Sequence, residues 1–535
     1  MLLSLFFLWI SLLWNFNTVI FENSLVFLDF IALNYKTISI DICLSLRIDT
    51  LSFLFLLLVI TIGLATNCYS LNYFKNEADE GLFLFWLNSF VASMGLLVLA
   101  ANYWSLFLGW ELIGLTSFFL INFWYFRRGT LKSSFKAFTF NLVSDVFLLF
   151  SFINFFIATG ANELYLVTFL SLTFSFSSTF YLGQGCIFLF LAASIKSVQL
   201  GGHLWLPDSM EAPVPASSLI HSATLVSAGV YLLVRFYDVL FSFGWHSLCL
   251  ISGSITAAYG GVVAAAQTDM KKLLAYSTMS HCGFLYVCVG LGNLYLLITY
   301  LFLHGLFKAA TFYCVGSFIR VFNSQDTRLM GGGSRLLPLD SLALIICSFN
   351  LGGLPFSIGY FYKKLFLSYF TWTPLSFIFM GCLILALLTG LVYTFRLVYF
   401  SVFDFYKGSL QYSLFFLQNA KVYFLGLYRV VTWGQLYALC ILVSFSLVTY
   451  FLILYIFNFF FIELSTFSLL EALNLEFYGI LNQQFIAYFI LFYSLYAFFL
   501  VILFFGETRF IFLKSQAVLL ILYGSLILGF LSLFL

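Results

Sequence analysis

Seven ionisable side chains lie within stretches of the sequence that are otherwise almost entirely apolar. They are Glu111, Asp145, Lys196, His221, His304, Lys308 and Lys363. A charged side chain in the middle of a membrane costs about 2.5 kcal/mol or more, so such a residue needs a partner or a function. Histidine titrates near neutral pH, and loss of water disfavours the charged form of lysine, so both types can accept and release protons. These residue types therefore indicate proton transfer inside a membrane.

Two of the lysines lie beside sequence signals that interrupt a helix. Lys196 comes shortly before one such signal, and Lys363 follows the other in LGGLPFSIGYFYKK. The predicted breaks are at Gly201, Gly202 and Pro207, and at Gly352, Gly353 and Pro355. Glycine and proline weaken or prevent a regular helical hydrogen-bond ladder, and the released backbone groups need protein or water around them. Two lysines beside two broken helices in separate parts of one chain are typical of duplicated transporter halves.

The remaining ionisable residues suggest partners for these lysines. His304 and Lys308 are four residues apart in LFLHGLFKAATF, so they share one face of a helix. We expect Glu111 to hold Lys196 protonated, so that movement or protonation of Glu111 lets that proton leave. For His221 and His304, a structural hydrogen bond between helices and a role in proton relay are both open.

The composition defines the surroundings of these residues. Of the 535 residues, 63% are hydrophobic and 8% are charged, and the mean hydropathy is +1.06. A soluble protein of this size would need a larger polar surface, so the chain is predicted to be an integral membrane protein. A net charge of +2 offers no basic surface for nucleic acid, which excludes that class of partner.

Some residues that could do chemistry are expected to be structural instead. The ten cysteines are scattered singly, without a CxxC pair, so no zinc or iron–sulfur site is predicted. His281, in AYSTMSHCGF, is expected to be structural. The N-terminal MLLSLFFLWISLLWNF has no basic region or cleavage site, which predicts a first membrane span that is retained.

Apolar runs of about 20 residues predict fifteen membrane spans. Their limits are 1–21, 50–74, 81–101, 103–126, 135–158, 181–201, 216–237, 246–267, 270–292, 294–322, 340–372, 374–403, 434–464, 485–505 and 515–535. Lysine and arginine concentrate in the loops after even-numbered spans, which supports this count. We divide the chain into N-terminal spans (1–101), a first antiporter-like half (103–237), a second half (246–403) and C-terminal spans (404–535).

A specific motif fills residues 202–236, GHLWLPDSMEAPVPASSLIHSATLVSAGVYLLVRF. It closely resembles the subunit 5 family of antiporter-like proteins in respiratory complex I, the mitochondrial NADH dehydrogenase, more than the sister subunits 2 and 4. Supporting segments lie around Glu111 and at 264–284, 304–317 and 327–338, in the order of the family. Together they cover roughly residues 45 to 400.

The resemblance implies an all-α polytopic membrane protein of about fifteen transmembrane helices, with two inverted repeats that each contain a broken helix. It implies a proton-pumping subunit in the membrane arm of NADH:ubiquinone oxidoreductase, driven by quinone chemistry elsewhere. Flavin, iron–sulfur clusters and quinone are expected on other subunits, with no cofactor on this chain. The implied partners are other membrane-arm subunits, especially the sister antiporter-like ones, and lipids. The implied location is the mitochondrial inner membrane, with a bacterial plasma membrane as the alternative.

The resemblance also suggests roles in the first half of the chain. Glu111 looks like the acid paired with Lys196, and Asp145 looks like the acid at the head of the relay. His221 looks like the link toward the second half.

In the second half, Lys308 looks like the central lysine, with His304 beside it, and Lys363 looks like the terminal lysine. The family usually has an aspartate after this lysine, but here Lys364 follows. Two further departures concern the ends of the chain. The N-terminus is one span short of the family pattern, and residues 507–514 leave room for a short turn where the family has a long lateral helix.

Two other functions remain open. The large subunit of a multisubunit sodium/proton antiporter has a similar fold and much of the same motif. A scaffold of the same fold without pumping activity is the other alternative. The two broken helices with their lysines favour a pumping subunit over such a scaffold.

Overall fold

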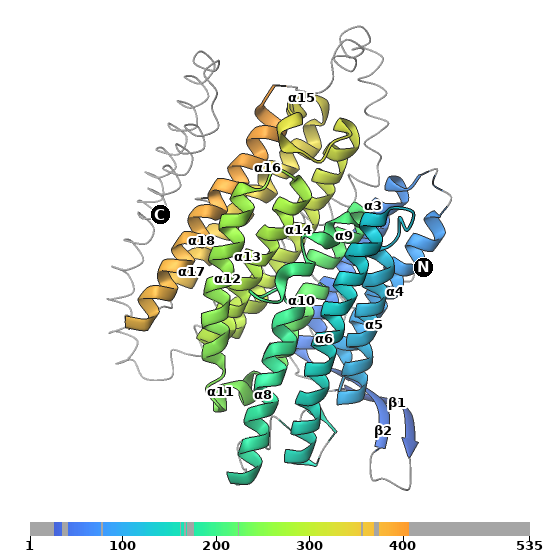
Figure 1. Cartoon of the computed structure of the whole chain (residues 1–535), viewed down its shortest axis with the longest axis vertical. Coiled ribbons are helices and arrows are strands. Elements are labelled where there is room, and N and C mark those ends of the chain that lie inside the picture. Colours follow the sequence, from blue (N-terminus) through green and yellow to red (C-terminus); the bar gives the residue numbers. More distant parts are fainter. Residues whose placement is uncertain are drawn as a thin grey trace.

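The computed structural model describes residues 26–34, 41–75, 77, 79–160, 162–164, 167, 176–222, 224–354, 357–368 and 374–405. Within these residues, ten helices are long and apolar enough to cross a membrane. They run close to parallel to one another (Figure 1). The prediction of a mostly helical, multi-pass membrane protein is confirmed. The predicted spans at 1–21, 434–464, 485–505 and 515–535 lie outside the described residues, so the total of fifteen stays a prediction.

The first half of the chain forms a group of helices followed by an irregular segment. Its helices are α3 (Thr50–Tyr73), α4 (Glu80–Leu99), α5 (Tyr103–Ile121), α6 (Arg128–Thr159), α8 (Phe176–Lys196), α9 (Val214–Ser222), α10 (Leu225–Arg235) and α11 (Tyr237–Ser242), with 3₁₀ turns η1 (His203–Trp205) and η2 (Asp208–Glu211). Capping boxes at Asp49 and Asn102 begin α3 and α5, since each side chain accepts from an otherwise unpaired backbone N–H. Gly160 ends α6 in the left-handed conformation, with φ of 67°.

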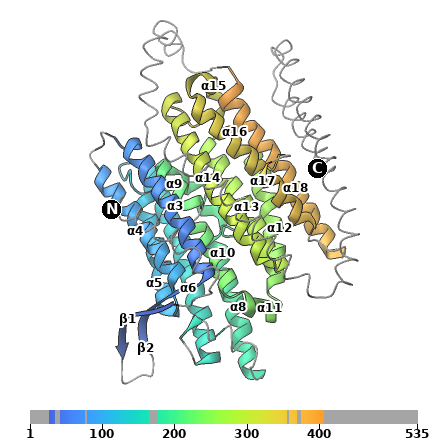
Figure 2. The ribbon, with the colours of Figure 1, turned by 180° about the vertical axis from the view of Figure 1, so that it is seen from behind.

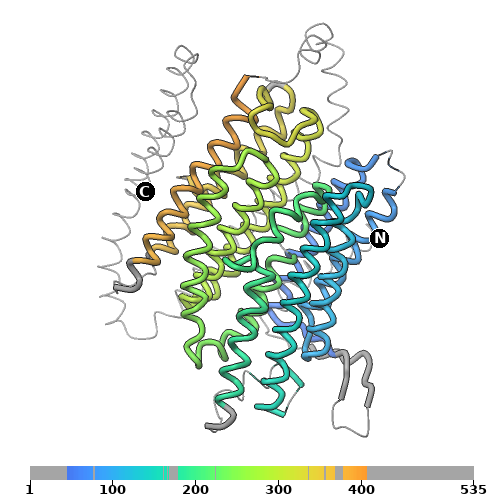
Figure 3. The backbone as a smooth tube through the Cα atoms, viewed as in Figure 1, coloured from blue at the N-terminus to red at the C-terminus, as the bar shows by residue number. Residues whose placement is uncertain are grey.

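The second half packs alongside the first. Its elements are α12 (His246–Ala266), α13 (Met270–Leu291), α14 (Leu294–Phe322), η3 (Thr327–Leu329), α15 (Gly333–Leu336), α16 (Pro338–Gly352), α17 (Ile358–Ser368), α18 (Pro374–Val398) and the π-helical turn η4 (Tyr399–Phe403). Helix α12 packs along α13 and α18, and α14 packs along α16 and against α9 of the first half. In the view from behind, the helices of the first half again lie on one side of the molecule and those of the second half on the other (Figure 2). Each predicted half contains an interrupted helix: the first interruption follows α8, and the second lies between α16 and α17. Figure 3 traces the backbone through both halves.

A two-stranded antiparallel hairpin is a departure from the all-α prediction. It pairs β1 (Val26–Asn34) with β2 (Asp41–Ile48), with an irregularity between Asp29 and Ile31. The sequence of β2, DICLSLRI, alternates polar or small residues with apolar ones, and this period of two favours a strand. The hairpin lies between the predicted spans 1–21 and 50–74, and this alternation is the signal in the sequence that identifies its second strand.

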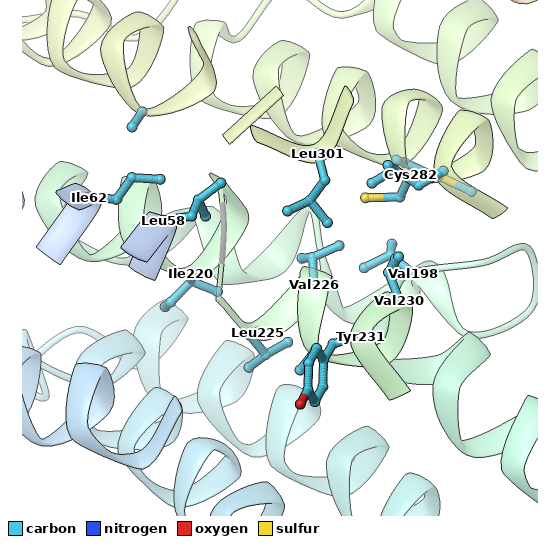
Figure 4. Packing of buried hydrophobic residues seen from close by; sticks show 14 of the residues in the cluster. Leu58, Ile62, Val198, Ile220, Leu225, Val226, Val230, Tyr231, Cys282 and Leu301 are labelled. Atoms are coloured by element: carbon cyan, nitrogen blue, oxygen red, sulfur yellow. The ribbon is translucent and has the colours of Figure 1, made fainter. Parts of the chain in front are cut away.

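Close contact between backbones holds α12 against α13. A Cβ added to Gly283 would lie 2.6 Å from the amide nitrogen of Ala257, and a Cβ on Gly253 would lie 2.7 Å from the carbonyl oxygen of Gly283. Small residues allow membrane helices to approach in this way, and van der Waals packing then stabilises the pair. Figure 4 shows part of the apolar core, where Val226 of α10 lies against Leu301 of α14 and Val230 lies beside Val198.

Asp49 joins the start of α3 to the end of α10. One carboxylate oxygen lies 2.5 Å from Arg47 Nε, and the other lies 2.5 Å from Arg235 Nη1. All three side chains are nearly buried. The ion pairs therefore link the hairpin, α3 and α10 at one end of the helices.

We expect Asp49→Asn to destabilise the protein by about 2 kcal/mol, because two nearly buried guanidinium groups lose their counter-charge. The midpoint of thermal unfolding of the purified complex should fall. The control is Asp238→Asn at the exposed start of α11, which should leave the midpoint unchanged. An equal midpoint for both variants would contradict a stabilising role for Asp49.

Candidate functional site

Lys196 is the last residue of α8, and its ammonium group is completely buried. Its Nζ donates to the carbonyl oxygen of Trp110 at 2.7 Å and lies 3.9 Å from the centre of the Trp110 ring. It also lies 3.9 Å from Asp145 Oδ1. Asp145 in turn accepts a 3.1 Å hydrogen bond from Ser144 Oγ. A carboxylate, a carbonyl and an aromatic face therefore surround this lysine.

The ion-pair partner of Lys196 is Asp145, and this differs from the predicted pairing with Glu111. Within the described part of the chain, no ion pair within 4.0 Å joins Glu111 to Lys196, although the two groups interact electrostatically. The reason is the rotation of α5. Successive residues on a helix point about 100° apart. Trp110 faces Lys196, so the next residue, Glu111, turns aside and remains half-buried.

The break after α8 lies near the predicted Gly201–Gly202 position but begins earlier, at Ser197. Val198 has φ of 62°, a left-handed conformation that is strained for a β-branched side chain, and Gly201 has φ of 99°. The segment is tied to the second half. Ser197 Oγ donates to Tyr286 Oη at 2.5 Å, and Gln199 Oε1 accepts from Thr256 at 2.7 Å. The first broken helix is therefore anchored on α12 and α13.

A second ion pair lies at the far end of this break, directly after Pro207. Lys136 of α6 bonds to Asp208 of η2, with Nζ 2.6 Å from Oδ2. Both side chains are partly exposed. This pair holds the irregular segment that contains Asp208 against α6.

His221 lies between the two halves. Its Nε2 is 3.1 Å from Ser209 Oγ, and its ring lies between those of Trp205 and Phe312 at centre distances of 6.2 and 6.3 Å. It also interacts electrostatically with Lys308. His221 of the first half therefore lies within electrostatic reach of Lys308 in the second half, and its role as the link stays a prediction.

The helix that carries His221 is itself interrupted, which the sequence did not predict. Helix α9 ends at Ser222, and α10 begins at Leu225. Thr224 Oγ1 donates to the carbonyl oxygen of Leu219, five residues earlier, at 2.7 Å. This hydroxyl gives the Leu219 carbonyl a side-chain partner next to the interruption. Threonine is common in helices, so it gave no clear signal for the break.

Lys308 is buried in α14 and is held by uncharged groups. Its Nζ donates to Ser277 Oγ and, at 3.4 Å, to the carbonyl oxygen of Leu274, both on α13. One turn earlier, the His304 ring centre lies 5.0 Å from that of His281. Within the described residues, no carboxylate lies within 4.0 Å of the Lys308 ammonium.

Lys363 reaches from α17 back to the end of α16. Its Nζ donates to the carbonyl oxygens of Leu351 and Gly352, each at 2.7 Å. These are terminal carbonyls of a helix, where the helix dipole attracts a positive charge. Gly353 caps α16 with φ of 75°. The predicted break at Gly352 and Gly353 is confirmed, whereas Pro355 lies outside the described residues.

The two broken helices therefore hold their lysines differently. Lys196 ends the segment before its break and contacts another helix, α5. Lys363 belongs to the segment after its break and contacts carbonyls of its own broken helix. In the described part of the chain, Lys196 has a carboxylate within ion-pair distance and Lys363 does not. Glycine and proline predicted both breaks, but they do not show which groups surround each lysine.

Sequence analysis did not single out several further buried ionisable residues, among them Lys271 and Asp340. Lys271, at the start of the predicted span 270–292, is 3% exposed and donates to the carbonyl oxygens of Ala212 at 3.0 Å and Met210 at 3.4 Å. Asp340, in the first turn of α16, is 2% exposed. Lys271 belongs to the cluster TDMKK, and a cluster of charged residues at the start of a span usually lies in water. Asp340 is a single acid at the start of an apolar run, and that isolation was a usable signal.

Among the residues that the structure describes, no three histidine, cysteine, aspartate or glutamate side chains gather as a potential metal site. The seven predicted residues instead form three groups. The first contains Glu111, Asp145 and Lys196, the second contains His221, and the third contains His304, Lys308 and Lys363. All of these groups suit the transfer of protons.

Comparison with known proteins agrees with this geometry. Residues 100–389 match the family model described as NADH:quinone oxidoreductase/Mrp antiporter, and residues 35–85 match the complex I chain 5 N-terminus. A NADH-ubiquinone oxidoreductase chain 5 from Paramecium tetraurelia is 41% identical over 475 residues, which are 86% of this chain and 81% of that protein. The chain belongs to the NADH-ubiquinone oxidoreductase chain 5 family. The resemblance found in the sequence is therefore confirmed.

Other members of the chain 5 family are longer than the matched region. The chain 5 protein of Acanthamoeba castellanii is 39% identical over 330 residues, which are 60% of this chain and 49% of that protein. The Mrp complex from Dietzia sp. DQ12-45-1b contains a chain of similar fold. The TM-score between that chain and this one is 0.65 at 23% sequence identity, and the match covers 94% of this chain and 58% of the other. This chain therefore shares its fold with a chain of the Mrp complex.

Proposed function

We propose that this chain is a proton-translocating subunit in the membrane arm of NADH:ubiquinone oxidoreductase. Protons are relayed through its buried glutamate, aspartate, lysine and histidine residues. The chain has no redox centre of its own, and flavin, iron–sulfur clusters and quinone belong to other subunits. Its partners are the sister antiporter-like subunits, other membrane-arm subunits and lipids, and its location is the mitochondrial inner membrane.

The observation that carries this proposal is the setting of Lys308 and Lys363. Both are buried, at 0% and 3% exposure, and their ammonium groups donate to hydroxyl and carbonyl oxygens. In the described residues no carboxylate pairs with either ammonium group within 4.0 Å. A buried ammonium without a counter-charge is costly, so such a lysine readily gives up its proton. These lysines can therefore alternate between charged and neutral forms.

The test is the number of protons translocated per NADH oxidised, measured with the assembled complex in sealed vesicles. We expect Lys308→Met to lower this ratio strongly, because methionine fills the same space but carries no proton. Lys272→Met, at an exposed position in the first turn of α13, should leave the ratio normal. A normal ratio for Lys308→Met in fully assembled complex would overturn the proposal.

The fold shared with an Mrp antiporter chain favours one alternative, sodium/proton exchange. The isolated chain in vesicles distinguishes the two functions. A subunit of NADH:ubiquinone oxidoreductase should show no sodium-dependent proton movement without its partners. Sodium-driven exchange by the chain alone would support the antiporter function instead.

A further inference from the structure

His281 has a setting that the relay described above does not use. It lies on α13, is 2% exposed, and sits between two tyrosines from other helices. Its Nδ1 is 2.5 Å from Tyr300 Oη of α14, and its Nε2 is 3.2 Å from Tyr393 Oη of α18. Both ring nitrogens therefore have a hydroxyl partner.

Hydroxyl partners suit a histidine that changes its protonation state. A tyrosine hydroxyl can donate or accept, whereas a carbonyl or carboxylate oxygen only accepts. Neutral imidazole needs one donor and one acceptor, and imidazolium needs two acceptors. Tyr300 and Tyr393 satisfy both forms by rotating their hydroxyl hydrogens, without moving the ring. The site can therefore hold His281 in either state.

The tyrosine on α18 also connects His281 to both lysines of the second half. The Tyr393 hydroxyl interacts with Ser277, which bonds to the Lys308 ammonium. On the other side, the Tyr393 ring and Lys363 Nζ both approach Gly390. They lie 4.0 and 3.6 Å from the position that a Cβ on Gly390 would occupy. Tyr393 thus lies between the Lys308 site and the Lys363 site.

Electrostatics couples the same groups. His281 interacts with the charges of His304, Lys308 and Lys363. The ring of His304 lies close to that of His281, with 5.0 Å between the ring centres. Loss of the proton from either lysine therefore changes the energy of a proton on His281, which is the condition for transfer between them.

We propose that His281 carries protons between Lys308 and Lys363, held for this purpose between Tyr300 and Tyr393. In the first step the Lys308 ammonium releases a proton, which passes through the hydroxyls of Ser277 and Tyr393 as each accepts one proton and donates its own. Lys308 becomes a neutral amine and His281 an imidazolium. In the second step the imidazolium returns a proton through Tyr393 to the neutral amine of Lys363, so His281 is neutral again. This inference rests on the proposed function.

The experiment compares variants of the assembled complex by protons translocated per NADH oxidised. His281→Gln is the central variant, because glutamine keeps one donor and one acceptor for the two tyrosines but cannot carry a proton. We expect a loss comparable to that of Lys308→Met. His246→Gln, at the start of α12 and outside the site, is the matched control and should behave as the natural protein.

The outcomes separate this inference from the proposed function. A normal ratio in Lys308→Met overturns the proposed function itself. A loss in Lys308→Met with a normal ratio in His281→Gln overturns only the role of His281 and leaves it a structural residue. If His281→Gln does not assemble, Tyr393→Phe decides, because it removes the hydroxyl link and leaves His281 bonded to Tyr300. A loss in Tyr393→Phe supports the inference, and a normal ratio overturns it.

Discussion

Replacing Lys196 with methionine is expected to abolish the proton translocation that depends on the first half of this chain, while the complex still assembles. Methionine fills most of the space of lysine, so packing around Trp110 is retained. Asp145 then loses the ammonium group that lies 3.9 Å away. An unpaired buried charge costs about 3 to 5 kcal/mol, so Asp145 would become protonated instead of remaining charged. The measurement is the number of protons translocated per NADH oxidised.

The same experiment distinguishes the two acids. Because Asp145 forms the ion pair and Glu111 does not, Asp145→Asn should reduce translocation more than Glu111→Gln. Each replacement preserves shape and removes only the charge. A larger effect of Glu111→Gln would show that the working partner of Lys196 is Glu111, and an unchanged ratio in Lys196→Met would exclude the first lysine from the relay.

Replacing Gly353 with alanine should displace Lys363 and sharply lower translocation. Gly353 caps α16 in the left-handed region, with φ of 75°. A Cβ at this position would lie 2.5 Å from Lys363 Cδ and 3.3 Å from its Nζ, so the lysine must move away from the carbonyls of Leu351 and Gly352. The backbone cost of an L-residue in this conformation adds about 1 to 2 kcal/mol.

A matched variant separates the backbone cost from the displaced lysine. Gly160 also caps a helix, α6, in the left-handed region, with φ of 67°, but a Cβ there would contact nothing within 4 Å. Gly160→Ala should therefore lose similar stability and keep normal translocation. Equal translocation by the two alanine variants, measured at equal amounts of assembled complex, would mean that the position of Lys363 at the end of α16 has no function.

The helical segments of the described region were largely predictable. The predicted spans 50–74, 246–267 and 270–292 match α3, α12 and α13 to within two residues at each end. Long apolar runs have one stable form in a membrane, because a helix satisfies all of its backbone hydrogen bonds within the segment. The predicted span 340–372 is divided into α16 and α17 at the glycines that marked the break.

Side-chain partners were less predictable. Asp145 takes the place expected for Glu111, and His281 joins three helices although it was expected to be only structural. The partners of His281 lie 19 and 112 residues away along the chain. No local pattern shows which way a helix turns about its own axis when its residues are apolar on all sides.

The amino-acid sequence by itself determined that this chain enters a membrane, where its long helices run, and that Lys196, Lys308 and Lys363 lie within them. Apolar length, glycine and proline act locally, so these properties follow from neighbouring residues. Only the tertiary structure decided what Lys196, Lys308 and Lys363 touch: a carboxylate for the first, hydroxyl and carbonyl oxygens for the second, and two terminal carbonyls for the third. Those contacts depend on helix rotation and packing between distant segments, which local sequence does not specify.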